Sequence, residues 1–240
     1  MIIAKFVAVV ILGYLLGSIS FGLLISRRRA RVDVREYGSG KTGATNVLRI
    51  AGGKAAALAA FADTLKGVLA VVFAGLIVGK DYLVIGDFAL GMLVAQVLAA
   101  LAAIAGHIWP VFFRFHGGRG VATFMGGLIA LCPPAGIFGG EIIIIGAGLT
   151  RYVSLGSIAG AVSTYAILIP LHILNNFPIE YLGYALIGAI IVITSHRDNI
   201  ARLVSGKERK LGDKAEERNL AQSSQSETPD FKQPHTGTQR

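Results

Sequence analysis

Charged residues are scarce in this chain of 240 residues: Asp, Glu, Lys and Arg make up 15% of it, against 53% hydrophobic residues. Soluble globular domains carry about 25% charged residues, so this composition cannot cover a water-facing surface. The 31 glycines follow no Gly-X-Y period, which excludes a collagen-like fold, and small residues suit close helix packing in lipid. The sequence therefore predicts an all-α, polytopic membrane protein.

The sequence also has few groups for metal or nucleophilic chemistry. A single cysteine, Cys132, excludes an internal disulfide, and no Cys/His cluster has metal-ligand spacing. A Gly-x-Ser-x-Gly elbow is missing, and no histidine begins the His-x-x-x-x-Asp pattern of many acyltransferases. We therefore expect no metal and no other cofactor. The formal net charge of +9 gathers between and after the apolar runs, which indicates membrane orientation rather than nucleic-acid binding.

Apolar runs that can cross a bilayer, which takes roughly 20 residues, recur along the chain. Five are clear, at 2–26, 54–79, 82–106, 153–174 and 179–195. The stretch 120–150 is too long for one span and is interrupted by Pro133-Pro134, so we expect two spans, 120–132 and 135–150. The sequence therefore predicts seven transmembrane helices.

The basic residues predict the orientation of these spans. With seven spans, 20 of the 23 Lys and Arg residues fall in segments on one side, namely 27–54, 107–119, 151–152 and 196–240. A single crossing at 120–150 would remove this asymmetry. Cytoplasmic loops carry such an excess, so we expect the N-terminus outside and the C-terminus in the cytoplasm. We predict a membrane domain over 1–206 and a hydrophilic, disordered cytoplasmic tail over 207–240.

The segment from Gly38 to Arg49 has the composition of an anion-binding loop. Glycines and small hydroxyl residues precede a helix-capable run, and backbone N–H groups at such a turn bind anions. Ser39, Thr45 and Asn46 can add side-chain donors, and Arg49 can hold a phosphate with two parallel hydrogen bonds. The alternative is a flexible loop with an ordinary helix cap. The segment is not a Walker P-loop, because its spacing differs.

Two further segments carry similar residues. Gly117, Gly118 and Gly120 surround Arg119 at the start of a span, which suits a phosphate or, alternatively, a tight turn that follows the orientation rule. His196 and Asn199, three residues apart, share a helix face at a membrane boundary. A lone histidine there is by default an interfacial polar residue. Two anion-binding loops on the same side favour a functional site and a phosphorylated, partly lipidic substrate.

Charges inside a span are the last feature. Asp63 and Lys66 lie three residues apart in the second long span, where an unpaired charge costs about 2.5–3.5 kcal/mol. A mutual ion pair would offset this cost, and it could mark function or only hold helices together. His107, beside Trp109-Pro110, is interpreted as a residue of the interfacial belt.

Together these stretches resemble the bacterial acyl-phosphate:glycerol-3-phosphate acyltransferases, the PlsY family. The resemblance extends from about Gly13 to Glu208. It is carried by six blocks in the family's order: Gly17-Ser18-Ile19, Gly38–Arg49, Asp63-x-x-Lys66-Gly67, Gly117–Thr123, Arg151-Tyr152-x-Ser154, and His196-x-x-Asn199-Ile200-x-Arg202-Leu203 through Glu208.

The resemblance implies a seven-helix enzyme of the bacterial cytoplasmic membrane with its active site facing the cytoplasm. It would transfer a fatty acyl group from acyl-phosphate to the 1-hydroxyl of sn-glycerol 3-phosphate. The products would be lysophosphatidic acid and phosphate, in the first step of phospholipid biosynthesis. Its partners would be these substrates and membrane lipid, with the enzyme that produces acyl-phosphate as a further candidate partner, and with no nucleic acid and no cofactor.

The resemblance also implies roles for individual residues. The pocket for the acyl-phosphate phosphate is expected at Ser39, Gly43, Ala44, Thr45 and Asn46. Glycerol 3-phosphate is expected at Arg49, Arg119, Ser154, His196 and Asn199, with Gly117, Gly118 and Gly120 as further substrate-binding residues. The catalytic residues would be His196, Asn199, Ser39 and Arg49. Structural roles are expected for Glu208, Asp63 and Lys66.

The expected chemistry needs no protein nucleophile, because acyl-phosphate is a mixed anhydride with a good leaving group. The enzyme would position two anions and neutralise the charge that develops on them. The base could be His196 or a phosphate oxygen of the substrate, and we favour the substrate. The chain departs from the family pattern at Lys41, Arg119 and Ser20. The rival interpretations are a transporter of an anionic metabolite and a non-catalytic membrane subunit.

Overall fold

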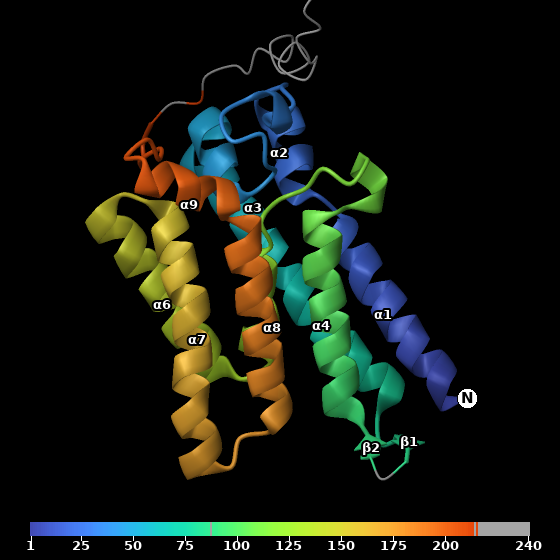
Figure 1. The fold of residues 1–240 in the computed structure, drawn as a ribbon. Coiled ribbons are helices and arrows are strands. Elements are labelled where there is room, and N and C mark those ends of the chain that lie inside the picture. Colours follow the sequence, from blue (N-terminus) through green and yellow to red (C-terminus); the bar gives the residue numbers. More distant parts are fainter. Residues whose placement is uncertain (87, 214, 216–240) are drawn as a thin grey trace, which may run out of the picture.

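The structure, a computed structural model, describes residues 1–86, 88–213 and 215, and it is a bundle of long helices (Figure 1). The first apolar run, expected as one span over 2–26, is broken. Helix α1 (Ile2–Ser18) ends two residues before α2 (Phe21–Arg29) begins. Ile19 is extended at φ −71° and ψ 106°. At this break the carbonyl oxygens of Gly17 and Ile19 accept hydrogen bonds from Lys66 of another helix. The hydrophobic pattern of the sequence does not reveal this long-range contact.

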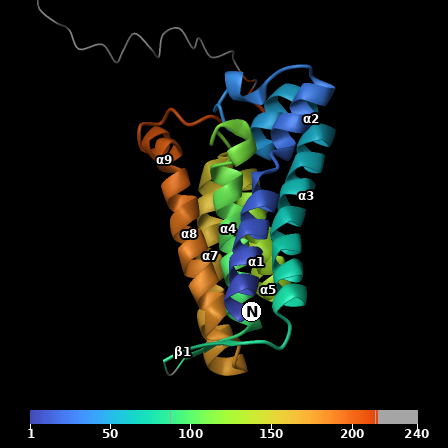
Figure 2. The ribbon, with the colours of Figure 1, turned by 90° about the vertical axis from the view of Figure 1, so that its right-hand side faces the viewer.

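Helix α3 (Ala44–Val78) is the longest, with 35 residues, and begins ten residues before the expected span at 54–79. It bends at Gly52, whose φ of 80° and ψ of 177° suit a residue without a Cβ. Since Gly43 is its N-cap, the second half of the first glycine-rich loop forms the first turns of α3. Those turns lie at the end of the bundle that also carries α2 (Figure 2).

The expected span at 82–106 is wrong at its start. Strands β1 (Leu83–Ile85) and β2 (Phe88–Leu90) pair antiparallel there, with Leu83 opposite Leu90, and α4 begins only at Met92 and ends at Ile108. A β-branched run followed by a turn at Gly86, with φ 59°, favours a hairpin. The all-α prediction therefore fails at this hairpin, which lies at the opposite end of the bundle from α2 and α9 (Figure 1).

The expected split of 120–150 is confirmed. Helix α5 (Val121–Leu131) stops before Pro133, which is the first residue of α6 (Pro133–Thr150), a position where proline is tolerated. The bundle continues with α7 (Val153–Asn175), α8 (Ile179–Ser195) and α9 (Arg197–Val204), the last two bent by 60°. Two 3₁₀ turns, η1 (Val34–Glu36) and η2 (Val111–Phe113), lie in the connecting loops.

Long apolar helices dominate the described residues. Five segments are long and apolar enough to cross a membrane, or six if α8 and α9 count as one span, whereas α5 has only 11 residues. The chain therefore has the make-up of a multi-pass helical membrane protein. The number seven stays a prediction.

Glycines bring the helix backbones close beneath the end that carries α2. A Cβ on Gly13 or Gly17 of α1 would overlap a backbone carbonyl of α4, and one on Gly67 of α3 would overlap the carbonyl of Thr123 on α5. Without side chains between them, helices in lipid gain van der Waals contact along their backbones. Helices α1, α3, α4 and α5 therefore form a tight support for the loops above them.

Candidate active site

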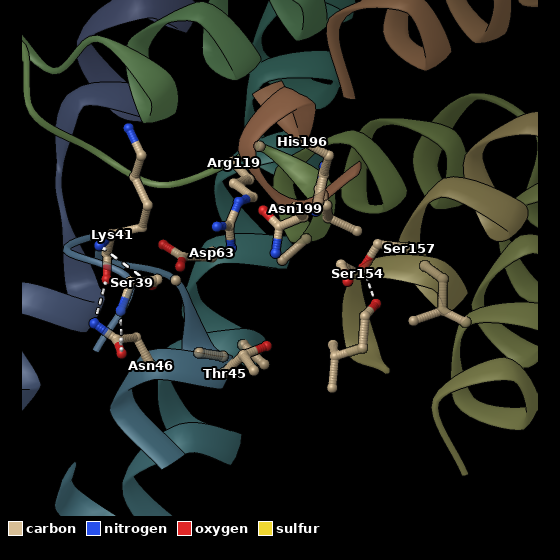
Figure 3. Close-up of a pocket in the computed structure, with 18 of the residues that line it drawn as sticks. Ser39, Lys41, Thr45, Asn46, Asp63, Arg119, Ser154, Ser157, His196 and Asn199 are labelled. Atoms are coloured by element: carbon tan, nitrogen blue, oxygen red, sulfur yellow. Dashed lines mark hydrogen bonds between the residues drawn. The ribbon is translucent and has the colours of Figure 1, made fainter. Parts of the chain in front are cut away.

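A cavity of about 370 Å³ opens at this end of the bundle. Its lining comes from segments far apart in the sequence, as Figure 3 shows for Thr45, Arg119, Ser154 and Asn199. The two stretches that the sequence singled out as anion-binding and the stretch with His196 and Asn199 therefore meet in one space. Of the expected site residues, those that line the cavity are Ser39, Gly43, Ala44, Thr45, Asn46, Arg49, Asp63, Arg119, Gly120, Ser154, His196, Asn199 and Glu208.

The first loop is shaped by one side chain. Asn46 is 2% exposed, and its Nδ2 donates to the carbonyl oxygens of Val34, Tyr37 and Lys41 at 2.9, 3.0 and 3.0 Å. Its Oδ1 accepts from the backbone N–H of Ser39 at 3.4 Å. The amide's donors are thus engaged by the protein's own carbonyls. In this structure Asn46 holds the loop that presents Ser39 to the cavity, instead of offering its own donors there.

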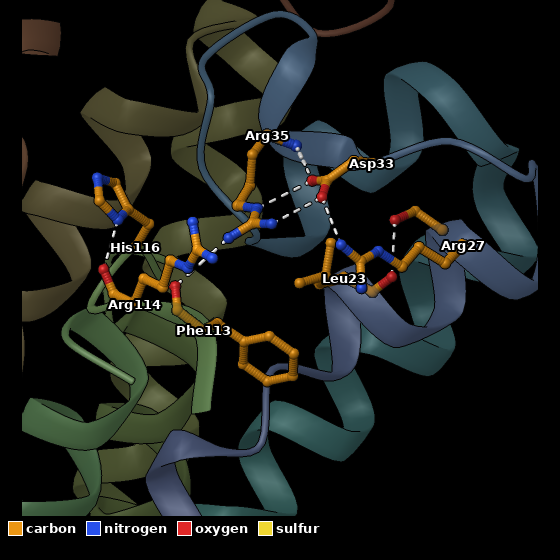
Figure 4. A network of polar contacts seen from close by, with 8 residues as sticks. Leu23, Arg27, Asp33, Arg35, Phe113, Arg114 and His116 are labelled. Atoms are coloured by element: carbon orange, nitrogen blue, oxygen red, sulfur yellow. Dashed lines mark hydrogen bonds and ion pairs between the residues drawn. The ribbon is translucent and has the colours of Figure 1, made fainter. Parts of the chain in front are cut away.

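A carboxylate fixes the segment that leads into the same loop. Asp33 accepts from Arg35 Nη2 and Arg27 Nη2, both at 2.7 Å, and from the backbone N–H of Arg35 at 3.0 Å (Figure 4). Arg35 also reaches the carbonyl of Phe113 at 3.4 Å. The hydrogen bonds from Arg35, joined by Arg27, hold the pKa of Asp33 well below its usual range despite partial burial.

The second loop is shaped by backbone contacts. The N–H of Gly118 donates to the carbonyl of His107 at 3.0 Å, and the N–H of Thr42 donates to the carbonyl of Gly117 at 3.4 Å, which ties the two loops together. A Cβ on Gly117 or Gly118 would overlap His107. These two glycines pack against the end of α4 and lie outside the cavity lining. Gly120, at φ 81°, turns the chain into α5 and does line it.

Arg119 is the principal cation of the second loop. Its Nε is buried and has no hydrogen-bond partner among the described residues. Burial, together with the charge of Arg202, lowers the pKa of Arg119 to about 10, so the side chain still carries its charge at neutral pH. The backbone carbonyl of Arg119 accepts from Ser195 Oγ at 3.0 Å. A buried cation with an unused donor beside a cavity suits an anionic ligand.

His196 and Asn199 stand at the bend between α8 and α9. His196 Nδ1 is 2.8 Å from the carbonyl of Val192, so Nδ1 donates and Nε2 is the acceptor of the neutral ring. Burial, and secondly the charge of Arg119, lower the pKa of His196 to about 4, so the ring is neutral at pH 7. Asn199 Oδ1 is buried and without a hydrogen-bond partner in the described structure.

Glu208 organises this side of the cavity. Its Oε1 accepts from Ser154 Oγ at 2.8 Å and from Asn199 Nδ2 at 2.5 Å, and its Oε2 accepts from Arg202 Nε at 2.8 Å. Burial alone would raise the pKa of Glu208, but the bonds from Asn199, Ser154 and Arg202 outweigh it, and the pKa lies below its usual value. Ser154 and Asn199 therefore depend on Glu208 for their orientation.

The segment after α9 covers the cavity. Leu211 and Arg151 form two hydrogen bonds. The N–H of Leu211 donates to the carbonyl of Arg151 at 2.6 Å, and Arg151 Nη2 donates to the carbonyl of Leu211 at 3.0 Å. Arg49 Nη2 is 3.5 Å from the carbonyl of Lys210. The first residues of the expected tail, up to Leu211, are therefore packed against the membrane domain. From 216 onward the expected tail lies outside the described residues.

Asp63 and Lys66 form the expected pair, with Lys66 Nζ 2.9 Å from Asp63 Oδ1. The interpretation of His107 as a belt residue is wrong. The ring is 5% exposed, and its Nδ1 lies 3.0 Å from Lys66 Nζ and 3.6 Å from Asp63 Oδ1. Its sequence neighbours Trp109 and Pro110 suggested an interface, whereas its partners come from a helix about 40 residues earlier.

Sequence reasoning missed part of the lining. Arg209 adds positive charge, and Ser157 adds a hydroxyl. Lys41, noted in the sequence only as a departure from the family pattern, lines the cavity as well. An apolar wall completes the cavity, formed by Met125, Gly140, Ile143, Ile144 and Val153. Nothing in the sequence distinguishes these apolar residues from their lipid-facing neighbours. Only the spacing of Ser157, three residues after Ser154, could have indicated a shared helix face.

The cavity thus joins cationic side chains to an apolar wall, within a multi-pass helical membrane protein. Such a site defines a protein that handles anionic lipids at a membrane. A family model described as glycerol-3-phosphate acyltransferase matches residues 7–206, and the chain belongs to this family. It is an integral membrane acyltransferase.

Individual relatives agree with this assignment. A glycerol-3-phosphate acyltransferase of Dehalococcoides mccartyi is 60% identical over 90% of this chain and 100% of its own length. One from Halalkalibacterium halodurans is 43% identical over 86% of this chain and 96% of its own. Two crystal structures of PlsY, an integral membrane glycerol 3-phosphate acyltransferase, in glycerol 3-phosphate and lysophosphatidic acid forms, have TM-scores of 0.74 and 0.72 at 36% and 34% identity. In both comparisons the matched region covers 86% of this chain and at least 95% of the chain in the crystal structure.

Proposed function

We propose that the chain transfers a fatty acyl group from acyl-phosphate to the 1-hydroxyl of sn-glycerol 3-phosphate. The products are lysophosphatidic acid and inorganic phosphate, in the first step of phospholipid biosynthesis. One observation carries the proposal: a single cavity is lined both by cationic side chains and by an apolar wall. It therefore suits two phosphorylated molecules of which one bears an acyl chain. The relatives' shared name supports the acceptor.

The two phosphates are assigned to different groups of the cavity. The first turn of α3, from Gly43 through Thr45, offers backbone N–H groups and the helix dipole, and Ser39 adds a hydroxyl. This is the place for the phosphate of acyl-phosphate. Arg49 and Arg119, each with an Nε that has no partner in the described structure, hold glycerol 3-phosphate. The acyl chain extends along Ile143 and Ile144.

The reaction needs positioning more than acid–base chemistry. The 1-hydroxyl oxygen attacks the acyl carbonyl carbon, the bond from that carbon to the phosphate oxygen breaks, and the hydroxyl proton passes to a phosphate oxygen of the substrate. Neutral His196, with Nε2 as acceptor, orients the hydroxyl, and the unpartnered Oδ1 of Asn199 can hold a second hydroxyl of the acceptor. Arg119 and the α3 N-terminus stabilise the charge that develops.

Purified protein incubated with palmitoyl-phosphate and glycerol 3-phosphate tests the reaction directly. We expect lysophosphatidate and equimolar phosphate by mass spectrometry. Palmitoyl-CoA and palmitoyl-acyl-carrier protein serve as alternative donors. Product from palmitoyl-CoA without product from palmitoyl-phosphate would refute the proposed donor.

The role of His196 has its own test. Because the ring orients the acceptor hydroxyl, His196→Ala is expected mainly to raise the KM for glycerol 3-phosphate. An unchanged KM with a kcat that falls by about 10²–10⁴-fold would instead identify His196 as the general base. Steady-state kinetics with both substrates varied separate the two outcomes.

The membrane arrangement is also part of the proposal. We infer seven spans, with α5 as a short one, the N-terminus outside, and the cavity facing the cytoplasm of the bacterial cytoplasmic membrane. The excess of Lys and Arg at the cavity end supports this orientation. A transporter would place its binding groups near the midplane, whereas these polar groups gather at one end. Thiol labelling of cysteines introduced at positions 80 and 210 in intact cells should modify only the former from outside.

The proposed domain organisation and partners follow from the same arrangement. The membrane domain covers 1–206, and the hydrophilic segment 207–240 contributes Glu208 and Arg209 to the cavity. An upstream enzyme that makes acyl-phosphate would deliver it at the cytoplasmic face. Co-purification of that enzyme from membranes with the full chain, compared with a chain ending after residue 215, tests this association.

A further inference from the structure

Asp63, Lys66 and His107 form a buried polar cluster that the proposed acyl transfer does not use. Asp63 and Lys66 come from α3, and His107 comes from the last turn of α4. The three residues are 1%, 2% and 5% exposed. Buried charges are costly unless they are paired and hydrogen-bonded, and replacing such a pair by apolar residues is often neutral or stabilising. Stability alone therefore gives a weak reason for this cluster.

Lys66 fixes the break between α1 and α2. Its Nζ donates to the carbonyl oxygens of Gly17 at 3.0 Å and of Ile19 at 2.9 Å. The last carbonyls of a helix have no partner within it, so this side chain bonds groups that the break exposes. Helix α2 then supports the first loop directly, because a Cβ on Gly22 would overlap the carbonyl of Thr42. Lys66 thereby sets the position of the first loop.

His107 connects the same side chain to the second loop. An ammonium group has only donors, so Nδ1 of His107 accepts from Lys66 and the ring proton lies on Nε2. The carbonyl of His107 accepts from the N–H of Gly118, and its ring leaves no room for a Cβ there. The next residue is Arg119. A displacement of His107 would therefore move the residue proposed to hold glycerol 3-phosphate.

Asp63 adds a third connection. Its backbone carbonyl accepts from Thr123 Oγ1 at 3.0 Å, at the start of α5, and its side chain lines the cavity. Figure 3 shows Asp63 between the segments that carry Ser39 and Arg119. Its carboxylate would repel a phosphate if Lys66 did not neutralise it. The cluster is thus the point at which both loops meet helices α1, α3, α4 and α5.

We propose that Lys66 is a positioning residue that holds the two anion-binding loops in register, through the α1–α2 break on one side and through His107 on the other. It touches neither substrate. The inference rests on the proposed function, because it concerns the distance between that site's two phosphates. A merely structural ion pair would stabilise the bundle without setting this distance.

Kinetics of Lys66→Met separate these roles. In this and the following experiments Lys66→Met is combined with Asp63→Asn, so that no unpaired carboxylate faces the phosphates. Each substrate can still bind its own groups, and we therefore expect both KM values to change little. The two substrates lose their alignment, and kcat is expected to fall by about 10²-fold, the size expected for a misplacement of about 1 Å. The matched control is Gln96→Leu, which removes another α4–α3 hydrogen bond, from Gln96 Nε2 to the Val71 carbonyl at 3.3 Å, away from the loops. Its kcat should match the wild type.

A double-mutant cycle with Arg119→Lys tests whether Lys66 acts through the second loop. If Lys66 sets the place of residue 119, the two effects on kcat should deviate from additivity by well over a factor of two. The effects of mutations at distant, independent sites are additive to within about a factor of two in rate. The effects of Gln96→Leu and Arg119→Lys on kcat should be additive in this sense. Additive effects for the Lys66 pair would contradict the proposal.

Amide hydrogen exchange gives a readout that needs no turnover. In Lys66→Met, amides of 17–20 and 117–120 should exchange faster than in the wild type, with both segments unchanged in Gln96→Leu. In His107→Gln, only 117–120 should change. A lower melting temperature with normal kcat and normal exchange would mean that the ion pair of Lys66 and Asp63 has only a structural role. The same conclusion would follow if the Lys66 and His107 variants both failed to fold while Gln96→Leu folded normally. If the wild type made no lysophosphatidate, the proposed function would fail, and the exchange result would still decide this inference.

Discussion

The two anion-binding loops are built in opposite ways. The first loop is held by side chains: Asn46 bonds three carbonyls from inside, and Asp33 joins Arg27 and Arg35 from outside. The second loop is held by close backbone packing that only glycine allows, because a Cβ on Gly117 or Gly118 would overlap His107. The first loop should therefore tolerate small shifts in packing and be sensitive to loss of hydrogen bonds. The second should be sensitive to a single added methyl group.

The difference also concerns what each loop offers a ligand. The first presents mostly backbone N–H groups at the start of α3, which are neutral donors in fixed positions. The second presents one charged side chain, Arg119, on a backbone fixed by contact. Oriented backbone amides can stabilise the charge on a leaving phosphate, and a cation can bind an anionic acceptor that arrives by diffusion. The contrast thus matches the proposed assignment of the acyl-phosphate phosphate to the start of α3 and of glycerol 3-phosphate to Arg119, together with Arg49.

The largest expected effect comes from Arg119, the charged group of the second loop. Arg119→Ala should lower kcat/KM by about 10²–10³-fold, as the loss of one preorganised donor to the reacting charge does. Arg119→Lys keeps the charge without the planar fork and should retain much of the turnover. Steady-state kinetics on both purified variants measure this. Wild-type activity in Arg119→Ala would exclude the second loop from the substrate site.

Gly118→Ala tests the contact that shapes the second loop. The new methyl group would overlap His107 Nε2, and overpacking of this kind costs about 1–3 kcal/mol in stability. We expect a lower melting temperature and a raised KM for glycerol 3-phosphate. The matched control is Gly183→Ala on α8, where a Cβ would meet nothing within 4 Å. If both alanine variants behaved alike, the contact with His107 would be irrelevant to the loop.

Asn46→Ala tests the side-chain clamp of the first loop. Three carbonyl oxygens would lose their donor, and a buried polar group left without a partner costs about 1–3 kcal/mol. Asn46→Asp, which keeps the shape but offers only acceptors, should be at least as damaging. Thermal unfolding measures the effect. Both variants should show lower unfolding temperatures, whereas full stability with lost activity would mean that Asn46 serves the ligand directly.

The positions of breaks and loops could be predicted only where the cause is local. Pro133 ends a helix by its own chemistry, and the split there was predicted correctly. The break after Ser18 depends on Lys66, whose bonds reach back 49 and 47 residues to Gly17 and Ile19. The hairpin at 83–90 was missed because an apolar run that continues into α4 masks it.

The candidate site was predictable in its segments but not in its internal contacts. Glycines with a cation or hydroxyls marked the first two stretches, and the spacing of His196 and Asn199 marked the third. Thr45, Arg119 and Asn199 do line one cavity. The clamp made by Asn46 and the burial of His107 depend on partners that only the fold brings together. Physical chemistry of the isolated residues predicts what they can bind, and the packing decides which of them are free to do so.

The smallest expected effect concerns Asp33, on the outer side of the first loop. Its pKa in the folded protein lies below the usual value of about 3.9, chiefly through the hydrogen bonds from Arg35. The ionised form therefore stabilises the fold at neutral pH, and this contribution is lost as the pH falls below about 3.9 towards the folded-state value. Because the arginines are partly exposed, with Arg27 at 51% and Arg35 at 27%, we expect a contribution of about 1 kcal/mol or less.

Unfolding of the wild type and of Asp33→Asn in detergent, followed from pH 7 to pH 3, isolates this contribution. Other carboxylates titrate in both proteins and cancel in the difference. The variant should be slightly less stable at pH 7, and the gap should narrow as the pH falls below about 3.9, because the unfolded chain then takes up a proton on Asp33 that the folded protein does not. A gap that stays constant with pH would mean that shape rather than charge holds the outer side of the loop. The first loop would then resemble the second, and the contrast between them would disappear.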